Sequence, residues 1–176
     1  MKNAALTKKA KLIRLVIFDV DGVLTDGKLF FGSTGEEHKV FHVHDGLGLK
    51  LLQQVGIDVA IISSRKSVAV TKRLKDLGVN HVYQGQENKN IAFKKLLKKL
   101  KLQPQQVAYA GDDLPDLIVM QQVGLSICVA NAHALLKQHA DWQTKTHGGF
   151  GAAREISEMI LNAQGKLAAI YKNYVF

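Results

Sequence analysis

LIRLVIFDVDGVLT, residues 12–25, is the stretch that decides the fold: a mostly apolar run ends in two carboxylates and a glycine. The run 12–18 has the length and character of a buried strand. Because side chains alternate along a strand, Asp19 and Asp21 at its end can point into the same space, and Gly22 lets the chain turn away sharply. We therefore predict a buried strand that delivers two acids to one site.

The rest of the chain alternates strand-like apolar runs with amphipathic helical stretches. Further strands are expected at residues 57–62, 80–83, 106–110 and 125–129. Helices are expected to begin near Gly46, Ser67, Lys89, Asp113, Ala132 and Gly151, and to end near Gly56, Gly78 and Gly124. This order predicts an α/β fold with a Rossmann-like, doubly wound, mostly parallel sheet, whose ligands bind at the carboxyl ends of the strands.

One segment breaks the alternation. Residues 28–43 contain LFF, GSTG and EEHKVFHV in succession, which predicts a projecting β-hairpin. Nothing else in the chain is long enough to form a separate cap domain. We therefore predict a single domain over residues 1–176, with a hairpin insertion at about 28–43 and a C-terminal helix and tail at about 151–176.

Composition and charge limit the function. The formal net charge is +9, and 7% of the residues are aromatic. Part of the charge lies at helical spacing among apolar residues, as a solvated helix face would show, on Lys94, Lys95, Lys98, Lys99 and Lys101. With few aromatic residues and no recognisable binding motif, we expect no nucleic-acid partner, although a basic surface does concentrate small anions such as phosphate esters.

Two further features bear on the compartment. No segment approaches the ~20 apolar residues that a membrane-spanning helix needs, so we expect no membrane insertion. The single cysteine, Cys128, lies in an apolar run and cannot form an internal disulfide. Such cysteine usage is typical of a reducing compartment, and we expect a cytoplasmic protein.

Polar groups follow the strand ends in chain order. Ser63 follows the second predicted strand, Lys89 opens a helix, and Asp112 follows the fourth predicted strand. Singly, each has a structural explanation as a helix cap, a solvated lysine or an acidic turn. Together with Asp19 and Asp21 they are expected to converge on one crevice. Two acids there suit a reaction in which one attacks phosphorus and the other transfers protons.

Four motifs carry a family resemblance. DVDGVLTDG (19–27), ISSR (62–65), QGQENK (84–89) and GDDLPD (111–116) resemble, in order, the motifs of the haloacid dehalogenase superfamily. FHVHDGLGLK (41–50) and THGGFGAAREISEMILNAQGK (146–166) narrow the resemblance to its cap-less phosphatases of 3-deoxy-D-manno-octulosonate 8-phosphate. The resemblance covers about residues 12–166. It implies a cap-less Rossmann-like fold, Mg²⁺, a homotetramer and a role in lipopolysaccharide biosynthesis of Gram-negative bacteria.

The resemblance also implies catalytic roles. Asp19 would be the nucleophile and Asp21 the general acid and base. Ser63 and Lys89 would hold the transferred phosphoryl group, with the lysine neutralising charge that grows as the bond breaks.

A metal site is implied beside these groups. Mg²⁺ would be held by the Asp19 carboxylate, the Asp21 backbone carbonyl, Asp112 and a phosphate oxygen, as suits a hard cation that prefers oxygen ligands. Asp113 and Asp116 are implied to orient water and the phosphate-binding lysine.

Substrate recognition is implied for one loop and several basic positions. Besides Asp21 and Lys89, these are His42, Val43, His44, Asp45, Gly46, Lys50, Arg65 and Arg73. Guanidinium groups bind carboxylates well, and the sugar acid carries one. For Arg73, a solvated surface arginine is an equally open interpretation.

Two departures from the family pattern bear on the sugar acid: His44 stands where arginine is usual, and Ser64 where glycine is common. Two alternatives therefore stay open, a phosphatase of a related nine-carbon sugar acid 9-phosphate and a non-catalytic oligomerisation module of the same fold.

Two local hypotheses remain. By strand parity, His38, His42 and His44 would share one face, which makes a zinc site conceivable, although no cysteine or acid completes a set nearby. The glycine-rich residues 146–151 are expected to form a flexible loop that could reach the active site of a neighbouring subunit.

Overall fold

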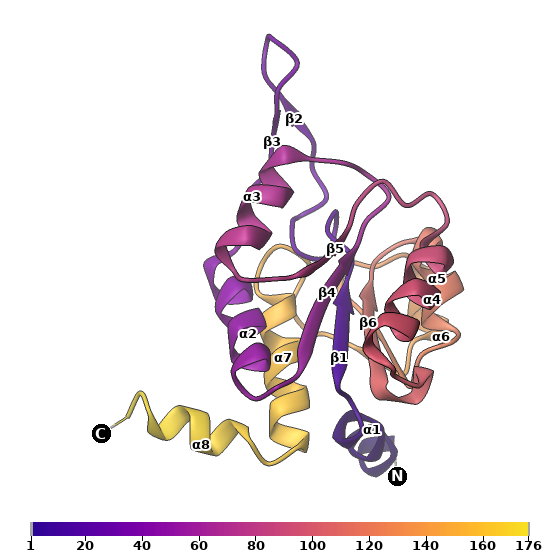
Figure 1. Ribbon diagram of the computed structural model, residues 1–176, viewed down its shortest axis with the longest axis vertical. Coiled ribbons are helices and arrows are strands. Elements are labelled where there is room, and N and C mark those ends of the chain that lie inside the picture. The colour runs from indigo at the N-terminus through magenta and orange to yellow at the C-terminus, as the bar shows by residue number, and fades with distance from the viewer. Residues whose placement is uncertain (1, 176) are drawn as a thin grey trace.

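A computed structural model describes residues 2–175 and places one six-stranded sheet between two layers of helices (Figure 1). All strand pairs of this sheet are parallel, in the order β5-β4-β1-β6-β7-β8. The strands are β1 Leu15–Phe18, β4 Asp58–Ile62, β5 His81–Tyr83, β6 Val107–Gly111, β7 Leu125–Cys128 and β8 Trp142–Gln143. The doubly wound, parallel α/β fold expected from the sequence is confirmed.

Helices cover both faces of the sheet. In Figure 1, α2, α3 and α7 lie on one side and α4, α5 and α6 on the other. The helices are α1 Lys2–Lys11, α2 Val43–Gln54, α3 Val68–Asp76, α4 Lys89–Leu100, α5 Leu114–Met120, α6 Ala134–His139, α7 Ala152–Ala163 and α8 Leu167–Lys172, with a short 3₁₀ turn at Pro104–Gln106. Among residues 2–175, none of these helices is long and apolar enough to cross a membrane.

The central strand explains where the site can form. Every residue of β1 is buried, because helices cover both faces, so its sequence is a continuous apolar run rather than an alternating one. In register, Phe18 lies opposite Ile61 of β4 and Ala110 of β6. The residues that follow these three strands therefore emerge side by side at one edge of the sheet.

The sequence missed or misplaced several elements. Helix α1, strand β8 and helix α8 were not expected, and the first strand begins at Leu15 rather than at residue 12. Gly56 and Gly78 have the positive φ of helix-ending glycines, 79° and 69°. Gly124 does not; it is a site of close backbone approach, where a side chain would overlap with the backbone of Gln105.

The expected hairpin is present but small. Strands β2 Phe30–Phe31 and β3 Glu37–His38 pair antiparallel and project beyond the sheet (Figure 1). The chain is helical from Val43 onward, so the strand parity assumed for three histidines is wrong. His42 accepts a hydrogen bond from the backbone N–H of His44 at the start of α2, whereas His38 pairs with Glu36 on the hairpin.

The glycine-rich loop packs against its own chain. The N–H of Gly149 donates to the carbonyl of Val23 at 2.9 Å, and a side chain at Gly148 would overlap with the backbone of Gly22. The loop therefore supports the turn that follows β1, and its reach toward the active site of a neighbouring subunit stays a prediction. Within the loop, Phe150 is an exposed apolar side chain, at 59%.

Candidate active site

A pocket of about 340 Å³ opens at the carboxyl ends of β1, β4 and β6. It gathers the motif residues: its lining consists of Asp19, Asp21, Gly27, Ser63, Ser64, Arg65, Lys89, Asp112, Asp113, Pro115 and Asp116. The predicted convergence of the four motifs on one crevice is confirmed. The sheet itself accounts for it, since parallel strands present all their carboxyl ends at one edge.

Lys89 lies at the centre of the pocket and is almost fully buried. Its Nζ donates to Asp19 Oδ1 and to Asp116 Oδ1, both at 2.6 Å. Burial alone would lower the pKa of Lys89, but the charges and hydrogen bonds of the two carboxylates outweigh it and raise the pKa above its ordinary value. The side chain is therefore a fixed positive charge beside Asp19, as a phosphoryl-binding group must be.

Asp116 organises the acidic turn. Its carboxylate accepts hydrogen bonds from the Tyr109 hydroxyl at 2.7 Å and from the backbone N–H groups of Asp112 at 3.0 Å and Asp113 at 3.3 Å. Asp113 in turn caps α5 by accepting from the N–H of Leu114. Asp116 thus aligns Lys89 and the Asp112 backbone at once, while Asp113 mainly holds the start of a helix.

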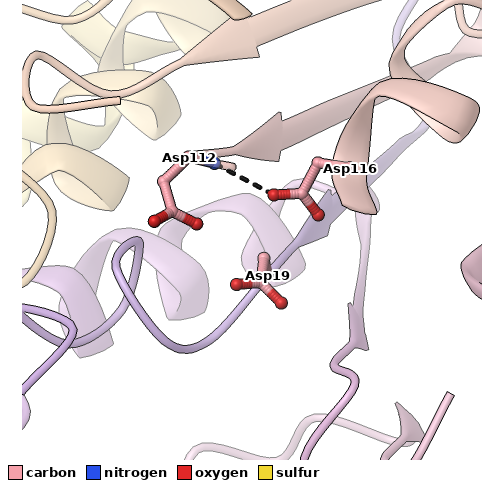
Figure 2. Close-up of side chains that lie close together, drawn as sticks. All are labelled: Asp19, Asp112 and Asp116. Atoms are coloured by element: carbon pink, nitrogen blue, oxygen red, sulfur yellow. Dashed lines mark hydrogen bonds between the residues drawn. The ribbon is translucent and has the colours of Figure 1, made fainter. Parts of the chain in front are cut away.

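Three carboxylates suit a divalent cation. Figure 2 shows Asp19, Asp112 and Asp116 pointing toward a common space, and each offers one oxygen within 4.8 Å of the others. Asp116 is already engaged by four donors, so Asp19 and Asp112 are the better ligands. Burial and the neighbouring carboxylates raise the pKa of Asp19 to about 7 and of Asp112 to about 8. Hard oxygen donors and excess negative charge fit Mg²⁺.

Gly22 lets the two acidic motifs meet. Its φ is 99°, in the left-handed region that favours glycine, and a Cβ there would overlap with the Asp112 carboxylate. The first motif therefore needs a glycine here, because the Asp112 carboxylate of the fourth motif occupies the space that a side chain would fill. Ser63 is buried at the edge of the pocket, and its Oγ accepts from the N–H of Arg65 at 3.3 Å.

The hairpin side of the pocket contains two residues that the sequence did not indicate. Lys39 makes ion pairs with Asp21 and with Glu37, and its side chain is only 1% exposed. Arg65 Nη2 donates to Glu37 Oε1 at 3.1 Å, and Arg65 Nε lies 3.9 Å from Asp21 Oδ2. No local sequence pattern marks these two residues, because the contact between Lys39 and Asp21 spans 18 residues.

The other residues predicted to bind substrate lie elsewhere. His42 to Gly46, Lys50 and Arg73 do not line this pocket. Asp45 is buried, and its Oδ1 accepts from the N–H of Arg154 in the first turn of α7 at 2.9 Å. The Arg73 side chain lies against Gly46, and Lys50 is exposed on α2. Helix α2 begins at Val43, before the expected start near Gly46, so residues 43–46 belong to a helix.

Known proteins match both the sequence and the fold. Haloacid dehalogenase-like hydrolases match residues 81–156. The 3-deoxy-D-manno-octulosonate 8-phosphate phosphatase of Escherichia coli (strain K12) is 52% identical over 165 residues, which cover 94% of this chain and 88% of that protein. The chain belongs to this phosphatase family.

Solved structures of the family agree. The 3-deoxy-D-manno-octulosonate 8-phosphate phosphatase from Yersinia pestis has a TM-score of 0.92 at 49% identity, covering 93% of this chain and 89% of that one. The enzyme from Moraxella catarrhalis, crystallised with a magnesium ion, a phosphate ion and a KDO molecule, has a TM-score of 0.94 at 44% identity, covering 96% and 97%. These family phosphatases share the cap-less fold described above.

Proposed function

We propose that the chain hydrolyses 3-deoxy-D-manno-octulosonate 8-phosphate to the free sugar acid and phosphate, through an aspartyl-phosphate on Asp19. The observation that carries this proposal is the pairing of Asp19 with Lys89 at 2.6 Å inside a pocket that also contains Asp21 and Ser63. The identity of the substrate is inferred from the family, since its members named above are phosphatases of this ester.

The reaction has two balanced steps. An oxygen of Asp19 bonds to phosphorus, the ester P–O bond breaks, and a proton from Asp21 goes to the leaving alkoxide. Water then attacks the phosphorus of the acyl phosphate and gives a proton to Asp21, and the bond between phosphorus and Asp19 breaks to release phosphate. Lys89 and Ser63 hold the phosphoryl oxygens as their negative charge changes.

Mg²⁺ is the proposed cofactor, with Asp19 and Asp112 as side-chain ligands and the Asp21 backbone carbonyl as a third. When bound, the cation supplies positive charge that offsets the repulsion between the carboxylates and the phosphate dianion. Asp116 and Asp113 then act through hydrogen bonds, because their oxygens hold Lys89, backbone amides and the start of α5.

Substrate recognition is proposed for Arg65, whose guanidinium lies at the mouth of the pocket and is 44% exposed in its side chain. A guanidinium there can meet the sugar carboxylate while the phosphate lies deeper. The proposed roles of His42, Val43, His44, Asp45, Gly46, Lys50 and Arg73 have less support, because they lie outside the pocket of their own chain.

Turnover on a panel of sugar-acid phosphates tests the proposal. Phosphate release from the octulosonate 8-phosphate is expected with Mg²⁺ and not in excess chelator. Preference for a nine-carbon sugar acid 9-phosphate would favour the open alternative, and lack of turnover on every ester would favour a non-catalytic module. Activity that persists in chelator would contradict the assignment of Mg²⁺.

We also propose a cytoplasmic homotetramer with a role in lipopolysaccharide biosynthesis. The hairpin exposes apolar side chains that self-association would cover, namely Leu29, Phe30, Phe31 and Val40. Each two-residue strand also offers an unpaired edge. Light scattering is expected to give about four times the chain mass of 19.4 kDa, and a fully active monomer at assay concentration would contradict the assembly.

A further inference from the structure

The two acids of the first motif each have a lysine of their own. Asp19 receives a hydrogen bond from Lys89, which also binds Asp116. Asp21 receives one from Lys39, which also contacts Glu37 at 3.1 Å. In both cases one buried ammonium bridges a reacting carboxylate and a second carboxylate that keeps the lysine in place.

The burial of the Lys39 side chain is unusual for a lysine on a hairpin. Its side chain is 1% exposed, although it lies on a projecting hairpin where lysines are normally solvated. For comparison, Lys28 on the same hairpin pairs with Asp26 and is 70% exposed. A buried ammonium is retained only where carboxylates compensate the loss of hydration, and Lys39 has two of them.

Glu37 connects this pair to the rest of the pocket mouth. Burial alone would raise the pKa of Glu37, but hydrogen bonds from Lys39 and Arg65 hold that pKa below its ordinary value. Glu37 therefore stays ionised between two cations and fixes Lys39 on the side of Asp21. The four charges alternate in sign along the mouth, so moving one disturbs the others.

We propose that Lys39 is a positioning residue for Asp21: it holds that side chain where, once protonated, it can transfer its proton to the leaving oxygen. This rests on the proposed phosphatase function. Among the side chains that the structure describes, no other lysine pairs with Asp21, and Arg65, its further cationic neighbour, is 3.9 Å away. Removing Lys39 leaves Asp21 free to rotate, so the penalty falls on the step that needs its proton.

Two simple esters isolate that step. Phenyl phosphate and 4-nitrophenyl phosphate lack the sugar acid and differ in how much the leaving oxygen needs a proton. We expect Lys39→Met to lower kcat on phenyl phosphate about 10-fold or more and on 4-nitrophenyl phosphate by less than about 3-fold, with KM nearly unchanged. Lys28→Met on the same hairpin is the control and should leave both esters unaffected.

Lys39→Gln serves as a second variant in case Lys39→Met does not fold, because it keeps a hydrogen-bond donor near Asp21; it should show the same selective loss at smaller size. Wild-type kcat on phenyl phosphate in these variants, or equal losses on both esters, would overturn the role of Lys39. Wild-type protein that turned over neither these esters nor the octulosonate 8-phosphate would instead contradict the proposed phosphatase chemistry, so the two failures are distinct. If only the octulosonate 8-phosphate is hydrolysed, wild-type kcat on that ester in the Lys39 variants would overturn the role of Lys39.

Discussion

The inner and the outer halves of the pocket mouth each contain a buried lysine that bridges two carboxylates. The two lysines differ in the secondary structure that holds them. In the inner half, Lys89 bridges acids that follow β1 and begin α5, all of them fixed by a six-stranded sheet. In the outer half, Lys39 bridges Asp21 and a hairpin residue, and each strand of that hairpin has two residues. A two-stranded hairpin alone is only marginally stable.

This difference separates the attack on phosphorus from the steps that involve the rest of the substrate, namely proton transfer to the leaving oxygen and recognition of the sugar acid. The groups proposed to attack and hold the phosphoryl group, Asp19 and Lys89, do not depend on the hairpin, so their geometry is set when the sheet forms. The proton-transferring Asp21 does depend on the hairpin, through Lys39. The groups that meet the remainder of the substrate depend on hairpin residues and, in the proposed tetramer, on how hairpins associate. Substitutions in the inner half should therefore lower turnover on every ester, and those in the outer half should change selectivity.

The largest effect is expected for Asp19→Asn in the inner half. An amide cannot serve as the attacking carboxylate, so kcat should fall by roughly 10⁴-fold or more on every ester. The melting temperature should change by only a few degrees. Steady-state phosphate release measures kcat, and thermal unfolding measures the melting temperature. Asp58→Asn, an exposed acid at the opposite end of the sheet, is the control, and substantial turnover by the Asp19 variant would refute the mechanism.

Gly22→Ala should have the next largest effect, because its methyl group displaces the Asp112 carboxylate from Asp19. We expect kcat/KM to fall by about 10²-fold and the Mg²⁺ concentration for half-maximal activity to rise. Gly35→Ala is a matched control in the hairpin: it also has positive φ, but nothing lies within 4 Å of the added Cβ. It should cost only ~1 kcal/mol of stability. Equal activity losses would contradict the separation of the two halves.

Arg65→Ala tests the outer half directly. The guanidinium should bind the sugar carboxylate, so KM for the sugar-acid phosphate should rise roughly 10–100-fold, while 4-nitrophenyl phosphate should change by less than about 3-fold. Arg14→Ala, which removes an exposed arginine just before β1 and outside the pocket lining, should leave both values unchanged. Equal losses on both substrates would mean that Arg65 serves phosphate binding or structure instead.

The smallest effect concerns stability and pH in metal-free protein. The raised pKa values of Asp19 and Asp112 mean that the folded state binds more protons than the unfolded state below about pH 8. The free energy of unfolding should therefore rise as the pH falls from 8 to 6.5, by on the order of 1 kcal/mol per pH unit. Below that, His81, whose pKa burial lowers, acts in the opposite direction.

Urea denaturation in chelator at pH 8, 7.2 and 6.5 measures this slope. Asp112→Asn should flatten it, because that group no longer titrates. Of these three pH values, saturating Mg²⁺ should stabilise the protein most at pH 8, where Asp19 and Asp112 are ionised to the greatest extent. Stability that falls as the pH decreases through this range would contradict the electrostatic account of the inner half.

The sequence by itself determined the sheet and the inner half of the site. Buried parallel strands must be continuous apolar runs, and their carboxyl ends must share an edge, so Asp19, Lys89 and Asp112 could be placed together from spacing alone. The short terminal helices and β8 carry weak patterns, which is why α1 and α8 were missed.

Only the tertiary structure decided the outer half. Whether residue 43 continues a strand or starts a helix depends on packing, because its neighbours suit both; α2 begins there, and Asp45 turns toward α7. Lys39 and Glu37 look like ordinary surface charges in the sequence. They join the site because the Lys39 side chain at the base of the hairpin contacts Asp21, a contact across 18 residues that no local pattern encodes.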